Sequence, residues 1–219
     1  MLRVKKIEMT AFMRKTSVCA VCICFAVTAY CQKSWETVPV NVQEISLESI
    51  TEIDVSFNQE NISVLQGTTD KIVVKEYRNK DDKKFFAKII NADNKLSIKR
   101  GSWLSWRLFS IVYSRIEIYI PATYKNVVNI RTTNGNIACT LAENAENVLL
   151  TTTSGNISLD LPKDIAASFS IKTVSGKLST PFSEKLSDSK SQQFVTGEGK
   201  PNKNIALKTV SGNIDIKQK

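Results

Sequence analysis

Apolar and polar residues alternate with period two through much of the chain from residue 50 onward. The alternation is clearest in TEIDVSFN, KIVVKEYRN, KLSIKR and RIEIYIPA, and turn residues such as Gly67 and Asp93-Asn94 stand between such runs. Period two is the spacing of a strand that buries one face. The best helical candidate, at 142–149, covers only about two turns. The pattern therefore predicts an all-β fold.

A ten-residue phrase occurs four times between residues 127 and 219. It reads RTTNGNIACT, TTTSGNISLD, IKTVSGKLST and KTVSGNIDIK, and its glycines are Gly135, Gly155, Gly176 and Gly212. The first two steps are 20 and 21 residues, whereas the last is 36, because a polar insertion at 180–204 precedes the final copy. A repeat near twenty residues is typical of solenoids. We expect the insertion to be a long loop.

The apolar parity shifts by one residue across each repeat glycine. In the last copy Leu207 and Thr209 share one face, but the apolar positions resume at Ile214. The chain must turn there, and we expect glycine to supply a positive φ. Two shapes satisfy the pattern: a two-residue hairpin, or a corner that leads into the next face of a solenoid. In either shape the repeated Thr and Asn can stack in ladders, so the phrase is predicted to be architectural.

The repeated T-x-S-G-N-I-x-L phrase follows a β-rich segment that contains EIYIPATYKNV. This combination resembles the bacterial putative-adhesin domain of unknown function, and it is similar also to the adhesin-head GIN domains of Bacteroidetes envelope proteins. The resemblance covers roughly residues 50–219. It implies an extracytoplasmic, β-solenoid-like domain without an established catalytic activity, often found beside envelope-stress or sigma-factor regulators.

The expected organisation is a single β domain at 50–219, with the repeats at 127–219 and a lead-in segment at 32–49. We expect a right-handed parallel β-solenoid or β-helix-like fold. An antiparallel hairpin meander or sandwich is the alternative, because sequence parity does not separate a hairpin from a corner.

Residues 1–31 have the composition of a secretory signal peptide. Arg14 and Lys15 precede a short run of apolar and small residues, too short for a comfortable membrane-spanning helix. Cleavage before Gln32 would release the chain to the periplasm, the outer-membrane surface or the extracellular space. Lipid anchoring at Cys31 is the alternative, although Tyr30 before it departs from the small residue that lipidation favours. The signal contributes much of the net charge of +9, and the remaining lysines are spread along the chain, which favours a solvated surface over a nucleic-acid site.

Side chains for catalysis are scarce. The sequence contains no histidine, so the usual general base and most zinc sites are lacking. Outside the signal Cys139 is the one cysteine, and its parity predicts a core position. The Asp and Glu residues are scattered, without a calcium-loop pattern. We therefore expect no enzyme, no cofactor and no metal site; a polysaccharide-acting enzyme with paired carboxylates is a minor alternative.

The segment GSWLSWRLFSIVYSR, residues 101–115, concentrates large apolar side chains between two predicted strands. It is either a hydrophobic cap on the open end of a solenoid or an exposed patch for a protein, a glycan or a membrane surface. In the second case the candidate partner-binding residues are Trp103, Trp106, Arg107 and Phe109. The predicted function is adhesin-like binding of an envelope protein or glycan, with no nucleic acid. An accessory role in envelope-stress signalling is the alternative.

Overall fold

The computed structural model describes residues 37–79, 81–100, 114–140, 145–182, 190–197 and 201–219. By its internal contacts the chain divides into two compact units, Met1–Pro39 and Val40–Lys219. The described strands all belong to the second unit. The predicted signal peptide and the four candidate partner-binding residues between 103 and 109 lie outside the described residues.

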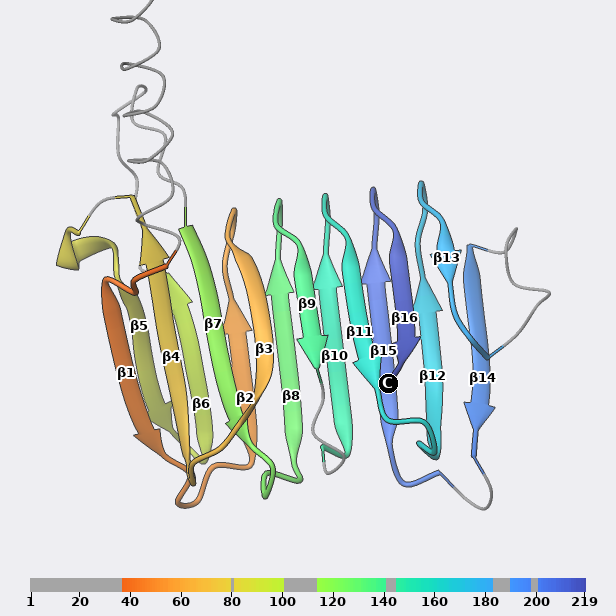
Figure 1. Cartoon of the computed structure of the whole chain (residues 1–219), viewed down its shortest axis with the longest axis horizontal. Helices are drawn as coiled ribbons and strands as arrows, with labels where there is room; N and C mark the ends of the chain where they lie inside the picture. The colour runs from red at the N-terminus through yellow and green to blue at the C-terminus, as the bar shows by residue number, and fades with distance from the viewer. Residues whose placement is uncertain (1–36, 80, 101–113, 141–144, 183–189, 198–200) are drawn as a thin grey trace, which may run out of the picture. The chain divides into compact units, whose positions relative to one another are not determined.

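Two eight-stranded sheets form this unit (Figure 1). Sheet A has the order β1 (Asn41–Ser46), β4 (Lys71–Arg78), β7 (Ser114–Pro121), β3 (Asn61–Gly67), β9 (Ile137–Thr140), β11 (Ile157–Leu161), β16 (Ile214–Gln218), β13 (Leu178–Ser179). Sheet B has the order β14 (Ser191–Thr196), β12 (Ala167–Lys172), β15 (Asn204–Thr209), β10 (Asn147–Thr152), β8 (Val127–Thr132), β2 (Glu52–Ser56), β6 (Lys95–Arg100), β5 (Ala87–Ala92). A single 3-10 turn, Lys83–Phe85, is the one helical element of the described chain. The predicted all-β class is confirmed.

Both sheets are mixed. From β7 to β13 in sheet A, and from β12 to β6 in sheet B, neighbouring strands run parallel. Antiparallel pairings hold β1 and β4 at one end of sheet A, and β5 and β14 at the two ends of sheet B. The strands before and after each repeat glycine lie in different sheets, as β8 and β9 do around Gly135. The hairpin alternative is therefore wrong for the repeats.

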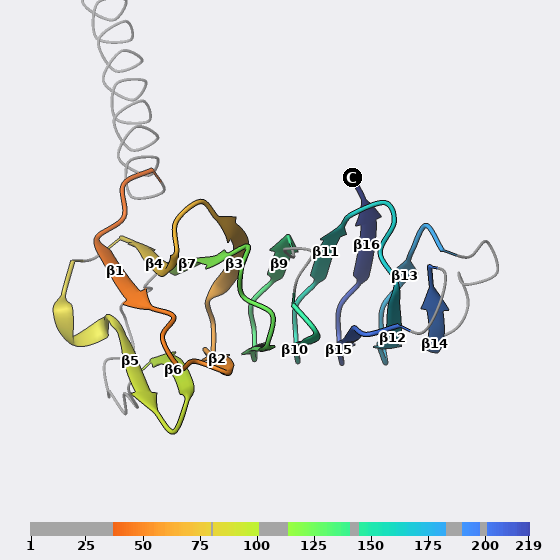
Figure 2. The ribbon, with the colours of Figure 1, turned by 90° about the horizontal axis from the view of Figure 1, so that it is seen from below.

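The hydrophobic core lies between the two sheets. Figure 2 shows one sheet on each side of this core. Burial alternates along nearly every strand, so the period-two pattern of the sequence matches a strand that buries one face. The inward positions expected from parity are buried, including Ile130, Leu150, Ile171 and Leu207. Cys139, exposed by only 2%, belongs to the same core, as expected.

The repeat glycines do turn the chain, but not through a positive φ. Gly197 is the one glycine with positive φ among the described residues, so that part of the prediction is wrong. Glycine is required because neighbouring corners pack backbone against backbone. A Cβ on Gly155 would stand 2.0 Å from the carbonyl oxygen of Gly135, and the same clash recurs from Gly212 to Gly155 at 1.9 Å. No side chain fits at such a distance.

Two hydrogen-bonded ladders join the corners, as the repeated Thr and Asn suggested. The Thr152 hydroxyl donates to the Gly135 carbonyl at 3.0 Å, and the Thr209 hydroxyl donates to the Gly155 carbonyl at 3.1 Å. The Asn156 amide N–H donates to the side-chain oxygen of Asn136 at 2.9 Å. The ladders satisfy polar groups where each strand ends.

A degenerate fifth corner, missed in the sequence, starts the ladder. Residues 57–64, FNQENISV, pair in register with the first glycine repeat. Glu60 takes the place of the glycine: its carbonyl accepts from the Thr132 hydroxyl at 3.3 Å, and Asn61 supplies the Asn rung to Asn136 at 2.9 Å. The signal that could have found it is the Glu-Asn-Ile-Ser word, which matches Gly-Asn-Ile-Ser of the second repeat apart from its first residue.

The last repeat is out of order in space. Strands β15 and β16 lie between β10/β11 and β12/β13, although they come after them in the chain. The insertion at 180–204, expected to be a loop, contains β14, which pairs antiparallel to β12. The 36 residues between Gly176 and Gly212 therefore include the edge strand β14 of sheet B, after which the chain returns to the position between β10 and β12.

Three phenylalanines close the end of the core next to β14. Phe169 is buried, and its ring lies 4.9 Å from that of Phe194 and 5.5 Å from that of Phe182. We expect Phe194→Ala to lower the free energy of unfolding by about 2 kcal/mol, less than a fully buried phenylalanine, because Phe194 is only partly buried. Urea unfolding measures the loss. An unchanged midpoint would contradict a capping role for this ring.

Candidate binding face

The outer face of sheet B is broad and carries an excess of positive charge. Strands from β5 to β14 present one outward side chain at every second position, and the outward side chains of neighbouring strands stand side by side. Six of them are cationic, and two, Glu52 and Asp54, are anionic. The cations are Lys88, Lys95, Lys99, Arg131, Lys172 and Lys208.

Five of the six cations share one register position, which we call the basic row: Lys88, Lys99, Arg131, Lys208 and Lys172. In the strand register Lys88 stands opposite Lys99, and Lys208 stands opposite Lys172. Ser56 lies between Lys99 and Arg131, and Thr151 lies between Arg131 and Lys208. All five side chains are exposed. With strands about 4.8 Å apart, the row runs across the sheet for roughly 30 Å.

Most of the basic row is unpaired. Arg131 lies 3.6 Å from Asp54, whereas Lys88, Lys99, Lys172 and Lys208 make no ion pair with any described residue. The acids of this face are occupied by Lys95, which lies 2.7 Å from Glu52 and 3.3 Å from Asp54. The hydrogen bond from Lys95 is the main cause that lowers the pKa of Glu52. Within the described residues, four lysines of the row are therefore left without an acid partner.

The outer face of sheet A is different, because its charges balance. It carries four cations and four acids, and three of the cations are paired: Lys71 with Glu44 at 3.1 Å, Arg115 with Glu117 at 3.4 Å, and Lys217 with Asp215 at 3.0 Å. The Tyr77 and Tyr119 hydroxyls both donate to Glu117, at 2.9 and 3.0 Å. Burial is the main cause that raises the pKa of Tyr119, to about 12, with Glu117 adding to it. In this cluster Tyr77, Tyr119 and Arg115 all contact the Glu117 carboxylate, so these groups are directed at one another rather than at a ligand.

A network of four charged groups lies at the β6 end of the core, where Glu60, Glu76 and Arg78 are buried and Arg100 is half-buried. Arg100 joins Glu60, at 2.5 Å, to Glu76, at 3.4 Å, and both Arg100 and Arg78 donate to the Phe85 carbonyl. Burial tends to raise the pKa of Glu60, but the Arg100 charge and two backbone amides outweigh it, so the pKa is lowered. The network lies at the edge of the core, with Glu76 fully buried, and its role is structural.

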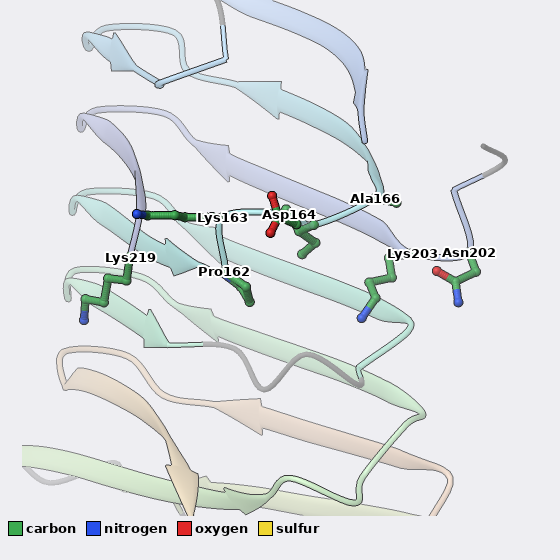
Figure 3. A pocket seen from close by; sticks show the side chains of 8 residues that line it. Pro162, Lys163, Asp164, Ala166, Asn202, Lys203 and Lys219 are labelled. Atoms are coloured by element: carbon green, nitrogen blue, oxygen red, sulfur yellow. The ribbon is translucent and has the colours of Figure 1, made fainter. Parts of the chain in front are cut away.

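One surface hollow of about 500 Å³ lies beside residues 162–166, which connect β11 to β12, and beside Lys219. Lys163, Lys203 and Lys219 line it, with Asp164 and Asn202 (Figure 3). Their side chains diverge in the close view, and Lys219 is engaged with Asp160 at 2.5 Å. The hollow offers no convergent set of polar groups, which a small-molecule site requires.

Chemistry that needs a nucleophile or a metal finds little support in the described part of the chain. Burial is the main cause that raises the pKa of the Cys139 thiol, to about 12, and nearby Asp160 adds to it, so the thiol stays protonated at neutral pH. Within those residues no group of three or more Cys, Asp or Glu side chains is placed to hold a metal ion. The same residues form no helix that is long and apolar enough to span a membrane.

The basic row was not predicted, although its signal is in the repeats. The residue before the repeat threonine is Arg131, Lys172 or Lys208 in three of the four copies. Sequence reasoning treated the lysines as scattered, because they are far apart in the chain. The strand register brings them onto one line. Of the predicted site residues, the four glycines form the corners, and the aromatic candidates are not described.

A family model and solved structures resemble this chain. The family model described as Toastrack DUF4097 matches residues 50–146 and, a second time, residues 127–217. A putative cell adhesion protein from Clostridium sporogenes superposes with a TM-score of 0.59 at 12% identity, over 82% of this chain and 98% of the other. A putative adhesin from Bacteroides fragilis has 13% identity and a TM-score of 0.26, over 80% of this chain and 96% of the other. No curated protein matches.

Proposed function

The chain belongs to the Toastrack DUF4097 family, and from that premise we propose that it is a non-catalytic, exported binding protein of the cell envelope, adhesin-like in its work. The match to a domain of unknown function supports the expected resemblance at the level of the family; the likeness to GIN domains stays a prediction. We further propose that the twelve strands joined by parallel pairings, six in each sheet, wind as one right-handed solenoid, which the shared strand order of the two sheets supports.

The observation that carries the proposal is the uneven distribution of charge between two faces of one rigid frame. Sheet A balances its charges internally, whereas sheet B presents four lysines on a regular surface that have no ion pair with any described residue. A preformed β-surface loses little conformational freedom on binding, so modest contacts at many points can add up to useful affinity. Binding is a better use of such a face than catalysis, because its groups are spread along a line rather than gathered around one point.

The test is sedimentation of the purified full chain with envelope material from the organism that encodes it. We expect co-sedimentation at low salt and release at high salt, because exposed charges are screened. Lys99→Glu/Lys208→Glu should abolish it, and Lys71→Gln/Lys217→Gln on sheet A should not. Binding that ignores both salt and the sheet B substitutions would contradict the assignment of the face. Release of soluble sugar from the envelope would contradict the absence of catalysis.

A further inference from the structure

We propose that the basic row binds a linear anionic glycan, a polysaccharide with a carboxylate or phosphate on its repeating unit, laid across the strands of sheet B. This inference rests on the proposed function and names its ligand. The chain of the glycan would run perpendicular to the strands, in line with Lys99, Arg131, Lys208 and Lys172, and its anionic groups would meet these cations in turn.

The shape of the charge favours a linear ligand. The cations occupy a single register position on β5, β6, β8, β15 and β12, and the neutral Ser56 and Thr151 fill the strands between them. A compact anion would touch one or two cations at most, because the row extends for roughly 30 Å. Only an extended molecule with repeated negative charge can satisfy the whole row.

Hydroxyl groups line part of the surroundings of the basic row. On the side toward the strand interiors the next outward positions are the small Ser97, Ala206 and Ser170 near the two ends of the row, and the larger Ile90, Asp54, Asn129 and Leu149. On the corner side the exposed Thr133 and Thr153 offer hydroxyl groups, whereas the exposed Val210 and Val174 stand next to Lys208 and Lys172. Hydroxyl groups that both donate and accept are the natural partners of sugar hydroxyls.

Other polyanions fit this face less well. None of the outward side chains of sheet B is aromatic, whereas single-stranded nucleic acid is held largely by base stacking on aromatic rings. A duplex is read by an element that enters a groove, and a flat sheet face has none. An anionic membrane attracts basic residues that cluster in a patch, whereas these cations form a line across the strands.

The experiment measures binding of the full chain to polygalacturonate, a linear polymer with one carboxylate per sugar, by isothermal titration at low salt. The matched ligand is the same polymer with its carboxylates methyl-esterified. We expect binding to the acid form, a steep decrease with salt, and none to the ester. Lys172→Gln/Lys208→Gln should weaken binding about tenfold, because two exposed charge contacts are lost. Lys71→Gln/Lys217→Gln, which removes the same charge from sheet A, should change it less than twofold.

Each remaining outcome counts against the proposal. Equal binding to acid and ester would show that charge is not recognised. Equal loss in both double variants would mean that net charge alone acts. Tighter binding to duplex DNA, or to vesicles with one third phosphatidylglycerol, would replace the glycan with those partners. If envelope material sediments with the chain but the acid polymer does not bind, the glycan is wrong and the binding function stands. If neither binds, both fail.

Discussion

Alanine at position 155 is expected to prevent the chain from folding stably. The added Cβ would stand 2.0 Å from the Gly135 carbonyl oxygen and 2.7 Å from its carbonyl carbon, both of them backbone atoms that cannot rotate away. The corner at Gly155 also has a neighbour on its other side, because Gly212 packs closely against the Gly155 carbonyl. Relief would require the corners to separate and the ladder of Thr152 to break. We expect a loss of more than about 4 kcal/mol in the free energy of unfolding, or no soluble folded protein.

Gly67→Ala is the matched control, because Gly67 is another glycine of the same sheets without a positive φ. Its Cβ would lie 3.3 Å from the nearest atom, the carbonyl carbon of Ile120, which a shift of a few tenths of an ångström relieves. We expect less than about 1 kcal/mol of change there. Urea unfolding followed by circular dichroism compares the two. A Gly155→Ala protein as stable as Gly67→Ala would refute the backbone contact as the reason for glycine.

Removal of one member of the buried charge network should cost nearly as much. Glu76 is fully buried, and it accepts from the Asn41 side chain and the Ala87 amide, each at 2.8 Å, as well as from Arg100. Glu76→Ala leaves Arg100 and the Ala87 amide without this partner inside the core. We expect a loss of about 3–5 kcal/mol in the free energy of unfolding. Glu44→Ala removes an acid of the exposed pair with Lys71 and should cost less than about 1 kcal/mol.

The network also predicts how stability depends on pH. The pKa of Glu60 is lower in the folded chain than its ordinary value of 4.5, so the folded state binds this proton less readily than the unfolded state. Its contribution to stability is complete above pH 4.5 and decreases as the pH falls through the lower folded value. Glu60→Gln should flatten the decrease below pH 4.5 in unfolding curves. A wild-type slope in that variant would exclude Glu60 as its source.

Much of the architecture could be predicted from local sequence, because it follows from local rules. Period-two burial identified the strands, and the parity shift located the corners at Gly135, Gly155, Gly176 and Gly212. The reason for glycine was not local: φ is a property of one residue, but the contact that excludes a side chain comes from the neighbouring corner. The corner at Glu60 was missed for a related reason, since it is the first of its ladder and meets Arg100 instead of another glycine corner.

The candidate binding face could not be predicted, because it depends on the order of strands in space. Lys88 and Lys172 belong to one row only because β5 and β12 lie in the same sheet. The alternation of apolar and polar residues does not indicate which strands are neighbours in a sheet. The basic residue before the repeat threonine pointed to three members of the row. Lys88 and Lys99 lie outside the repeats and gave no such sign.

The late position of β15 and β16 in the chain has a consequence for biosynthesis. A regular array can grow from its first unit to its last as the polypeptide emerges, but here the slot between β11 and β13 stays vacant until residues 204–218 arrive. Until then β10, β11, β12 and β13 each lack a neighbour, and open strand edges invite pairing with other chains. Pairing with other chains is therefore most favourable before residues 204–218 have been synthesised. Loss of these residues to a protease would leave a gap between β10 and β12 in sheet B and between β11 and β13 in sheet A, rather than a shortened end.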